Sequence, residues 1–112
     1  MAFSEFQADR VRQRLQHLHI VEKKMMGGLI FMVNDKMCVG IDIDKETGND
    51  RLMARIGKKE YLAALALKGC REMDFTGKVM RGFVFIDPEG FDTEEDFDFW
   101  IEKALEYNRE NS

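Results

Sequence analysis

No run of apolar residues in this sequence is long enough to cross a lipid bilayer. The first five residues, Met1 to Glu5, also lack the basic and apolar regions of a secretory signal, so we expect a cytoplasmic protein. Cysteine is scarce, with only Cys38 and Cys70 among the 112 residues. Two thiols in a chain without an export signal usually stay reduced, and we expect both to be small buried or half-buried side chains.

The motifs of nucleotide-binding and nucleophilic enzymes are missing as well. Gly77-Lys78 resembles the end of a phosphate-binding loop, but that loop needs a glycine at the position of Glu72 and a serine or threonine at Val79. No Ser-His-Asp or Cys-His arrangement is present as a local motif. Cys38 falls in an expected strand, where burial raises the pKa of a thiol and makes it less reactive. We therefore predict no enzymatic activity, no catalytic residue and no bound cofactor.

Metal-binding patterns are also absent. The segment 42–46 resembles the start of a calcium loop, but Thr47 stands where the glycine is needed and Met53 where the bidentate carboxylate is needed. A solvated hairpin loop is the expected structure there. His17 and His19 lie two residues apart without the Cys or carboxylate spacing of a zinc site, so we expect them at the surface. The sequence predicts no metal site.

What is present is an ordinary globular mixture, 45% hydrophobic and 34% charged. A chain of 112 residues has room for one core, so we expect a single domain over residues 1–112. The charge is uneven: residues 1–81 carry 15 basic against 11 acidic side chains, and residues 82–112 carry 2 against 10. Two interpretations remain open. Either the acidic residues favour the positive end of a helix, or the basic body 1–81 meets an anionic partner.

Helical periodicity predicts three helices. Ser4 and Gln7 have the spacing of a capping box at the start of the first, an amphipathic helix whose basic face we expect to be solvated. The second helix is short and is expected to end at Gly69. The third has the strongest apolar stripe. They cover residues 5–18, residues 58–67 and a segment that opens at Thr93.

Short apolar runs separated by turn residues predict strands between the helices. Asn34-Asp35 is expected to form a tight hairpin, and Gly27-Gly28 to let the backbone bend before a strand. Thr76-Gly77-Lys78 is typical of a turn within a segment that supplies one or two strands. The expected strands are residues 24–26, 29–33, 37–41, 51–56 and 82–86.

The order α-β-β-β-β-α-β-β-α is typical of an α+β protein. We predict a two-layer sandwich in which three helices cover a largely antiparallel sheet of about five to six strands. Residues 29–33 and 83–86 lack the alternation of apolar and polar residues that a half-solvated strand shows. Either helices wrap both faces, or the uncovered face is buried against another molecule. Self-association of that face is the preferred interpretation.

Several segments, spread over nearly the whole chain and in order, resemble one known family. They are residues 24–28, 31–33, 37–40, 51–52, 55–57, Tyr61, residues 71–84, residues 87–90 and Trp100. The chain is similar to the N-terminal domain of the TfoX/Sxy regulators of bacterial competence. The resemblance implies a two-layer α/β sandwich and a regulatory role. Longer competence regulators carry a second, C-terminal helical domain, whereas this sequence is expected to be a stand-alone N-terminal domain.

The family-like segments contain a set of charged side chains that we predict to form an interaction surface. These residues are Lys24, Arg55, Asp74, Lys78 and Arg81. The alternative is that the cations among them are solvated or paired with carboxylates. Methionines fall mostly on expected strands and would fill an irregular core, but several of them on one face would form an adaptable contact surface.

Three hypotheses for function follow. The first is a non-enzymatic regulatory module that binds a protein partner or forms a homodimer. The second is a nucleic-acid-associated regulator that uses the basic body 1–81, although no known reader motif is present. The third is a small-ligand-binding domain, which no motif supports. The first is our prediction, with no membrane association expected.

Overall fold

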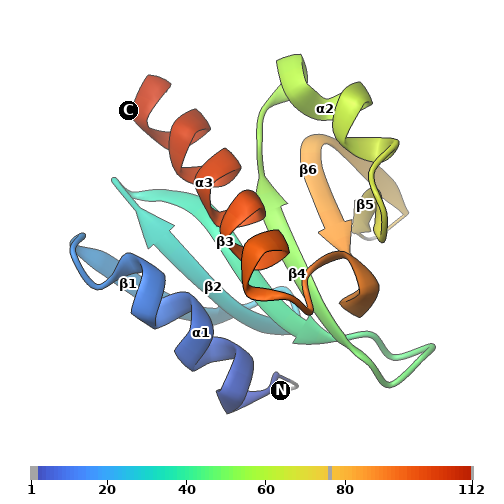
Figure 1. Cartoon of the computed structure of the whole chain (residues 1–112), viewed down its shortest axis with the longest axis horizontal. Coiled ribbons are helices and arrows are strands. Elements are labelled where there is room, and N and C mark those ends of the chain that lie inside the picture. The colour runs from blue at the N-terminus through green and yellow to red at the C-terminus, as the bar shows by residue number, and fades with distance from the viewer. Residues whose placement is uncertain (1–2, 76, 112) are drawn as a thin grey trace.

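The structure is a computed structural model, which describes residues 3–75 and 77–111. Its order of helices and strands confirms the predicted α-β-β-β-β-α-β-β-α arrangement, with one short 3-10 turn, η1 (Pro88–Gly90), before the last helix (Figure 1). The helices are α1 (Glu5–Leu15), α2 (Lys58–Leu65) and α3 (Glu94–Glu110). The strands are β1 (Ile20–Met25), β2 (Gly28–Val33), β3 (Lys36–Ile43), β4 (Asp50–Arg55), β5 (Cys70–Phe75) and β6 (Lys78–Ile86).

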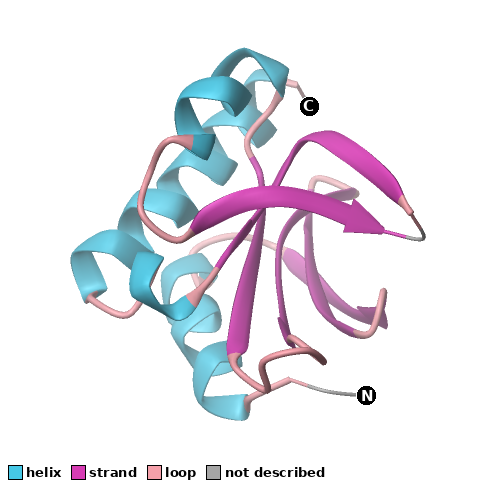
Figure 2. Cartoon of the chain, turned by 90° about the vertical axis from the view of Figure 1, so that its right-hand side faces the viewer, coloured by secondary structure: helices cyan, strands magenta, loops and turns pink. Residues whose placement is uncertain are grey.

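The six strands form one sheet in the order β1-β2-β3-β4-β6-β5, and every neighbouring pair is antiparallel. All three helices lie on one side of this sheet, as Figure 2 shows. The predicted α+β class and two-layer sandwich are therefore confirmed. No helix in the described part of the chain is long and apolar enough to span a membrane.

The tight turns form where the sequence predicts them. Asn34 and Asp35 both have positive φ, 53° and 64°, as the two-residue turn between β2 and β3 requires. Gly27 has φ 79° in the turn that joins β1 to β2. Of the turn predicted at residues 76–78, Thr76 lies outside the described residues, while Lys78 begins β6. Gly69 does not end α2, because that helix stops at Leu65.

Capping differs in detail from the prediction. The Ser4 hydroxyl accepts a hydrogen bond from the Gln7 amide, which confirms Ser4 as the cap of α1. The Gln7 side chain does not return the bond; its amide nitrogen donates to Asp50 and its oxygen accepts from Arg10. Thr93 caps α3 by accepting from the Asp96 amide. Half of the predicted capping box therefore serves a tertiary contact instead.

The prediction that the basic face of α1 is solvated is wrong for two of its arginines. Arg10 is buried and donates to the carbonyl oxygens of Phe91 and Asp92. Arg14 lies next to it and pairs with Glu94. Both guanidinium groups stack on the ring of Phe97, at 4.0 and 4.5 Å from its centre. Glu94 at the acidic start of α3 thus pairs with Arg10 and Arg14, which the periodicity of α1 alone predicts to be solvated.

The main core lies between the sheet and the helices. Its largest fully buried side chains include Phe31 from β2, Leu52 from β4 and Phe91, Phe97 and Ile101 from the C-terminal segment. Trp100 is also buried, and its indole nitrogen donates to the carbonyl of Gly90 at 3.0 Å. This core fixes the helix layer and leaves the other face of the sheet without a helix over it.

The sheet is strongly curved, and its two edges bend away from the helices (Figure 2). Consequently β2 is buried along most of its length on both faces, with only Met32 of its six residues less than fully buried. The alternative in which helices wrap both faces is wrong, because all three helices lie on one side. Side chains of the neighbouring strands bury the middle of the open face, and its burial against another molecule stays a prediction.

Candidate interaction site on the open face of the sheet

A row of side chains crosses the open face from strand to strand. The register pairs Ile30 with Gly40, Gly40 with Met53, Met53 with Phe85, and Phe85 with Arg71. Paired residues of neighbouring strands point to the same side of a sheet, so these five positions share one face. An added Cβ on Gly40 would lie 2.6 Å from Ile30 Cδ1, so the Ile30 side chain would have to move to make room for it. Ile30 and Met53 therefore close over the backbone of β3.

The methionine face is the apolar cluster that surrounds this row. It contains seven of the eight methionines in the sequence. Met53 and Met73 are buried at 4% and 2% exposure, and the other five methionines are only partly buried. Its members are Met25, Met26, Met32, Met37, Met53, Met73 and Met80, together with Ile30, Phe83 and Phe85. Several methionines thus do share one sheet face, which is the condition under which the sequence suggested an adaptable contact surface.

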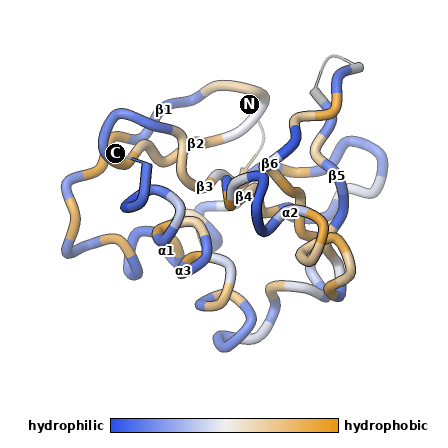
Figure 3. Tube along the Cα trace, turned by 90° about the horizontal axis from the view of Figure 1, so that it is seen from above, coloured by the Kyte–Doolittle hydropathy of each residue, from blue (hydrophilic) through white to orange (hydrophobic). Residues whose placement is uncertain are grey.

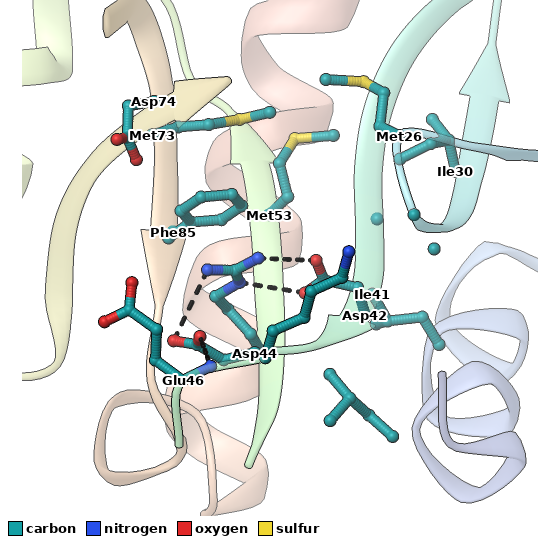
Figure 4. A pocket seen from close by; sticks show the side chains of 16 residues that line it. Met26, Ile30, Ile41, Asp42, Asp44, Glu46, Met53, Met73, Asp74 and Phe85 are labelled. Atoms are coloured by element: carbon teal, nitrogen blue, oxygen red, sulfur yellow. Dashed lines mark hydrogen bonds and ion pairs between the residues drawn. The ribbon is translucent and has the colours of Figure 1, made fainter. Parts of the chain in front are cut away.

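A hollow of about 540 Å³ opens within the methionine face. In Figure 4, Met53, Met73 and Phe85 lie together in this hollow, and Met26 reaches in from the turn between β1 and β2. The carboxylates of the β3 end and of the following loop lie beside the apolar group. The hollow thus combines a flexible apolar floor with a charged border.

Arg51 connects the floor to the border. Its guanidinium lies 3.7 Å above the centre of the Phe85 ring and forms two hydrogen bonds to Asp42, at 3.0 and 2.7 Å. A guanidinium that is stacked and bound by both donors in this way is held firmly in one position. Its charge is neutralised inside the protein and is not offered to a ligand.

Asp44 joins a second arginine to the same network. Its carboxylate accepts from Arg71 at 2.8 Å, and Arg71 also donates to Asp87 at 2.9 Å. The backbone amide of Glu46 and the two neighbouring arginines hold the pKa of Asp44 below its ordinary value, although burial opposes them. The loop 45–49 is exposed, as a solvated hairpin loop should be, but Asp44 itself is buried.

The structure separates the five residues of the predicted interaction surface. Asp74 lines the hollow on the methionine face. Arg55 and Arg81 lie together in a different hollow, beside the start of α2. Lys24 is exposed on β1, and Lys78 is exposed at the first position of β6. They therefore do not form one continuous surface, and whether any of them binds a partner stays a prediction.

Sequence reasoning missed the residues that border the hollow. Asp42 appeared only at the start of a segment that fails as a calcium loop, Arg51 and Phe85 were treated as parts of strands, and Arg71 appeared only in a family-like segment. Their shared face depends on the register of four strands, which no local motif records. The spacing of Arg51 and Met53, two residues apart on one strand, is the signal that could have placed both on the same face.

Ion pairs also occupy much of the positive charge in residues 1–81. Arg12 contacts Glu5, Asp9 and Glu22. A pair also forms between the two parts of the chain, where Lys103 of the acidic segment 82–112 contacts Glu60. The arginines of residues 1–81 that form ion pairs with carboxylates are Arg10, Arg12, Arg14, Arg51 and Arg71. The excess of basic residues in the sequence therefore presents fewer free cations than their number suggests.

Neither thiol has the surroundings of a nucleophile. Cys38 is buried in the main core, and Cys70 is partly buried. Burial raises the pKa of Cys38 to about 12 and that of Cys70 to about 11. Both placements confirm the predicted small buried or half-buried side chains. Among the described residues, no three His, Cys, Asp or Glu side chains lie close enough to hold a metal ion.

A raised thiol pKa lowers the thiolate fraction at pH 8, so alkylation should be slow in the folded protein. We expect iodoacetamide to modify both cysteines on the order of a hundredfold more slowly than in the urea-unfolded chain. Mass spectrometry of timed samples would measure the two rates. A native rate for Cys70 equal to the unfolded rate would contradict the burial described here.

Comparison with known proteins places the whole arrangement in one family. The family model of the TfoX N-terminal domain matches residues 13–107, which include the complete sheet and α2. The chain belongs to the TfoX N-terminal domain family. No curated protein and no solved structure shows significant similarity to the chain. The methionine face and the hollow described above thus belong to the part of the chain that defines it as a TfoX N-terminal domain.

Proposed function

We propose that this TfoX N-terminal domain is a non-enzymatic regulatory module that binds an apolar segment of a partner protein on its methionine face. The observation that carries the proposal is the concentration of seven methionines on the one sheet face that no helix of the described chain covers. Methionine is unbranched and polarizable, so a methionine-rich surface repacks around differently shaped apolar groups.

The charges in the hollow support an apolar occupant. Asp42 and Arg51 bind each other, and Asp44 is held by Arg71. These charges have their partners already, so a charged ligand would have to break existing ion pairs to use them. An apolar side chain placed against Met53 and Met73 displaces only water and buries apolar surface. Protein interfaces commonly have this form, an apolar centre with a polar border.

The test replaces two half-buried methionines at the outside of the cluster, so that the fold is retained. We expect Met32→Glu and Met80→Glu each to weaken binding of an apolar peptide at least tenfold, because each adds a carboxylate to the apolar contact. The peptides would be selected from a displayed library on the wild-type protein and measured by fluorescence anisotropy. Phe6→Glu is the matched control, because Phe6 is 69% exposed on α1 in the other layer.

The binding position is read from the methionine methyl groups. In protein labelled with ¹³C at the methionine methyls, the selected peptide should shift the signals of Met53 and Met73, which lie in the hollow. The proposal is wrong if the selected peptides do not shift these methyl signals and bind the Met32→Glu variant as tightly as they bind the wild type. Methyl shifts that follow dilution of the protein alone would show a second copy of the chain on this face instead of a partner segment.

A further inference from the structure

A second groove lies on the other side of the sheet, between α2 and the strands β5 and β6. Figure 3 shows apolar stretches on α2 and on β6, the elements that border it. Its volume is about 490 Å³. It is lined by Lys58, Tyr61, Leu62, Leu65, Glu72, Val79 and Arg81. None of these residues belongs to the methionine face, so the groove is independent of the function proposed above.

An irregularity in β6 brings Arg81 and Val79 to this groove. Met80 and Phe83 both belong to the methionine face although they are three residues apart, so the alternation of the strand shifts between them. The shift occurs at Gly82, which has φ 94° and whose carbonyl accepts from the amides of Ile56 and Gly57. Arg81 consequently points to the side of the sheet that carries α2.

The groove contains a buried polar group without a partner. Tyr61 is only 6% exposed, and its hydroxyl makes no hydrogen bond in the described part of the chain. Burial and the carboxylate of Glu72 raise the pKa of this hydroxyl, while Arg81 opposes them. An unpartnered buried hydroxyl destabilises a protein, so its presence indicates a donor reserved for something outside the chain.

The groove also has two cationic side chains among its lining residues. Lys58 and Arg81 line the groove and form no ion pair within residues 3–75 and 77–111. Both also line the adjoining hollow of about 380 Å³, together with Arg55 and Gly57. Gly57 precedes α2 and has no side chain to cap it, so no side chain of its own neutralises the positive end of the helix.

The remaining wall of the groove is apolar and unusually exposed. Leu62 is 79% exposed and Val79 49% exposed, on opposite sides of the groove. Leu65 lies one helical turn from Leu62 on α2, so the two leucines form a continuous apolar strip. The groove therefore has a cationic end with a free hydroxyl donor and an apolar side.

We propose that this groove binds an organic anion, a phosphate or carboxylate group that carries a short apolar chain. The anionic group lies between Lys58 and Arg81 and accepts a hydrogen bond from the Tyr61 hydroxyl. The apolar chain lies against Leu62, Leu65 and Val79. Glu72 is the one carboxylate among the lining residues, and it repels the anion and so limits the affinity. Removing its charge should therefore strengthen binding, whereas removing a cation should weaken it.

The first experiment compares four probes by isothermal titration calorimetry. Butyl phosphate should bind about tenfold more tightly than inorganic phosphate, because a partly buried butyl group removes apolar surface from water. Pentanoate tests the carboxylate form of the ligand, and 1-butanol, which has no charge, should not bind. Failure of both butyl phosphate and pentanoate to bind at millimolar concentration would overturn the proposal.

Variants separate a built site from general attraction to a basic surface. Arg81→Gln should weaken binding of the better probe at least tenfold, and Glu72→Gln should strengthen it. Lys59→Gln is the matched control, because Lys59 lies on the same helix but does not line the groove. It should change affinity less than about twofold. Equal losses for Arg81→Gln and Lys59→Gln would show non-specific attraction only and overturn the proposal.

Tyr61→Phe distinguishes a binding role from a structural one. It should weaken binding about fivefold while leaving the ligand-free protein at least as stable, because it removes a hydroxyl that has no partner. The measurements are calorimetry for affinity and urea unfolding for stability. Binding equal to that of the wild type, or destabilisation of the free protein, would show that the hydroxyl is not a donor reserved for the ligand.

Discussion

Replacing Gly57 by alanine is expected to lower the free energy of unfolding by about 4 kcal/mol, from backbone strain and steric overlap together. Gly57 has φ 87° and ψ 160°, a conformation that is almost restricted to glycine. An added Cβ would lie 2.6 Å from Cε1 of Tyr107 and still closer to Cδ1. The ring could escape only by leaving its position beside Arg55, which lies 5.5 Å from the ring centre. Urea unfolding would measure the loss.

Two further variants separate the two causes. Gly48→Ala also places alanine at a positive φ, 75°, but nothing lies within 4 Å of the added Cβ. It should lose only about 1 kcal/mol. Adding Tyr107→Ala to Gly57→Ala should recover part of the loss, since it removes the overlap and leaves the strain. Equal effects of Gly48→Ala and Gly57→Ala would contradict the close packing of α3 on the start of α2.

Arg10→Met is expected to destabilise the protein by about 3 kcal/mol, because it leaves buried acceptors without donors. The side chain of Arg10 donates to Gln7 and to the carbonyls of Phe91 and Asp92, and it contacts Glu94. Methionine fills much of the same volume but supplies none of these hydrogen bonds. The segment before α3 would lose its connection to α1. Urea unfolding measures this loss as well.

Arg12→Met provides the control on the same helix. Arg12 forms more ion pairs than Arg10, with Glu5, Asp9 and Glu22, but its side chain is 34% exposed. Solvent weakens such pairs, so we expect a loss of less than about 1 kcal/mol. If Arg12→Met proved as destabilising as Arg10→Met, burial would not be the reason for the importance of Arg10.

Local signals in the sequence predicted most of the fold. The turn at Asn34-Asp35 needs only two adjacent residues that accept positive φ, and the cap of α3 needs only Thr93 and the amide three residues later. The apolar stripe of α3 repeats within a single element. Such features depend on neighbours in the chain, which is why their positions agree closely with the structure.

Features that depend on distant segments could not be predicted in this way. The burial of Arg10 requires the carbonyls of Phe91 and Asp92, more than eighty residues away. The double burial of β2 results from curvature of the whole sheet. In the predicted interaction surface, Arg81 lies beside α2 because the alternation of β6 shifts at Gly82, whereas a regular strand would place it on the methionine face.

Neighbouring strands of the sheet differ in how much chain connects them. Among the strands that the structure describes, β4 and β6 are the only neighbours that do not follow one another in the sequence. Every other pair is a hairpin, which closes a short loop at low entropic cost, whereas joining β4 to β6 encloses α2 and β5. The rate-limiting step of folding is therefore expected at this seam, where Leu52 to Arg55 meet Phe83 to Ile86. The hairpins of β1 to β4 and the hairpin of β5 and β6 would form first, and the pairing of β4 with β6 would form last.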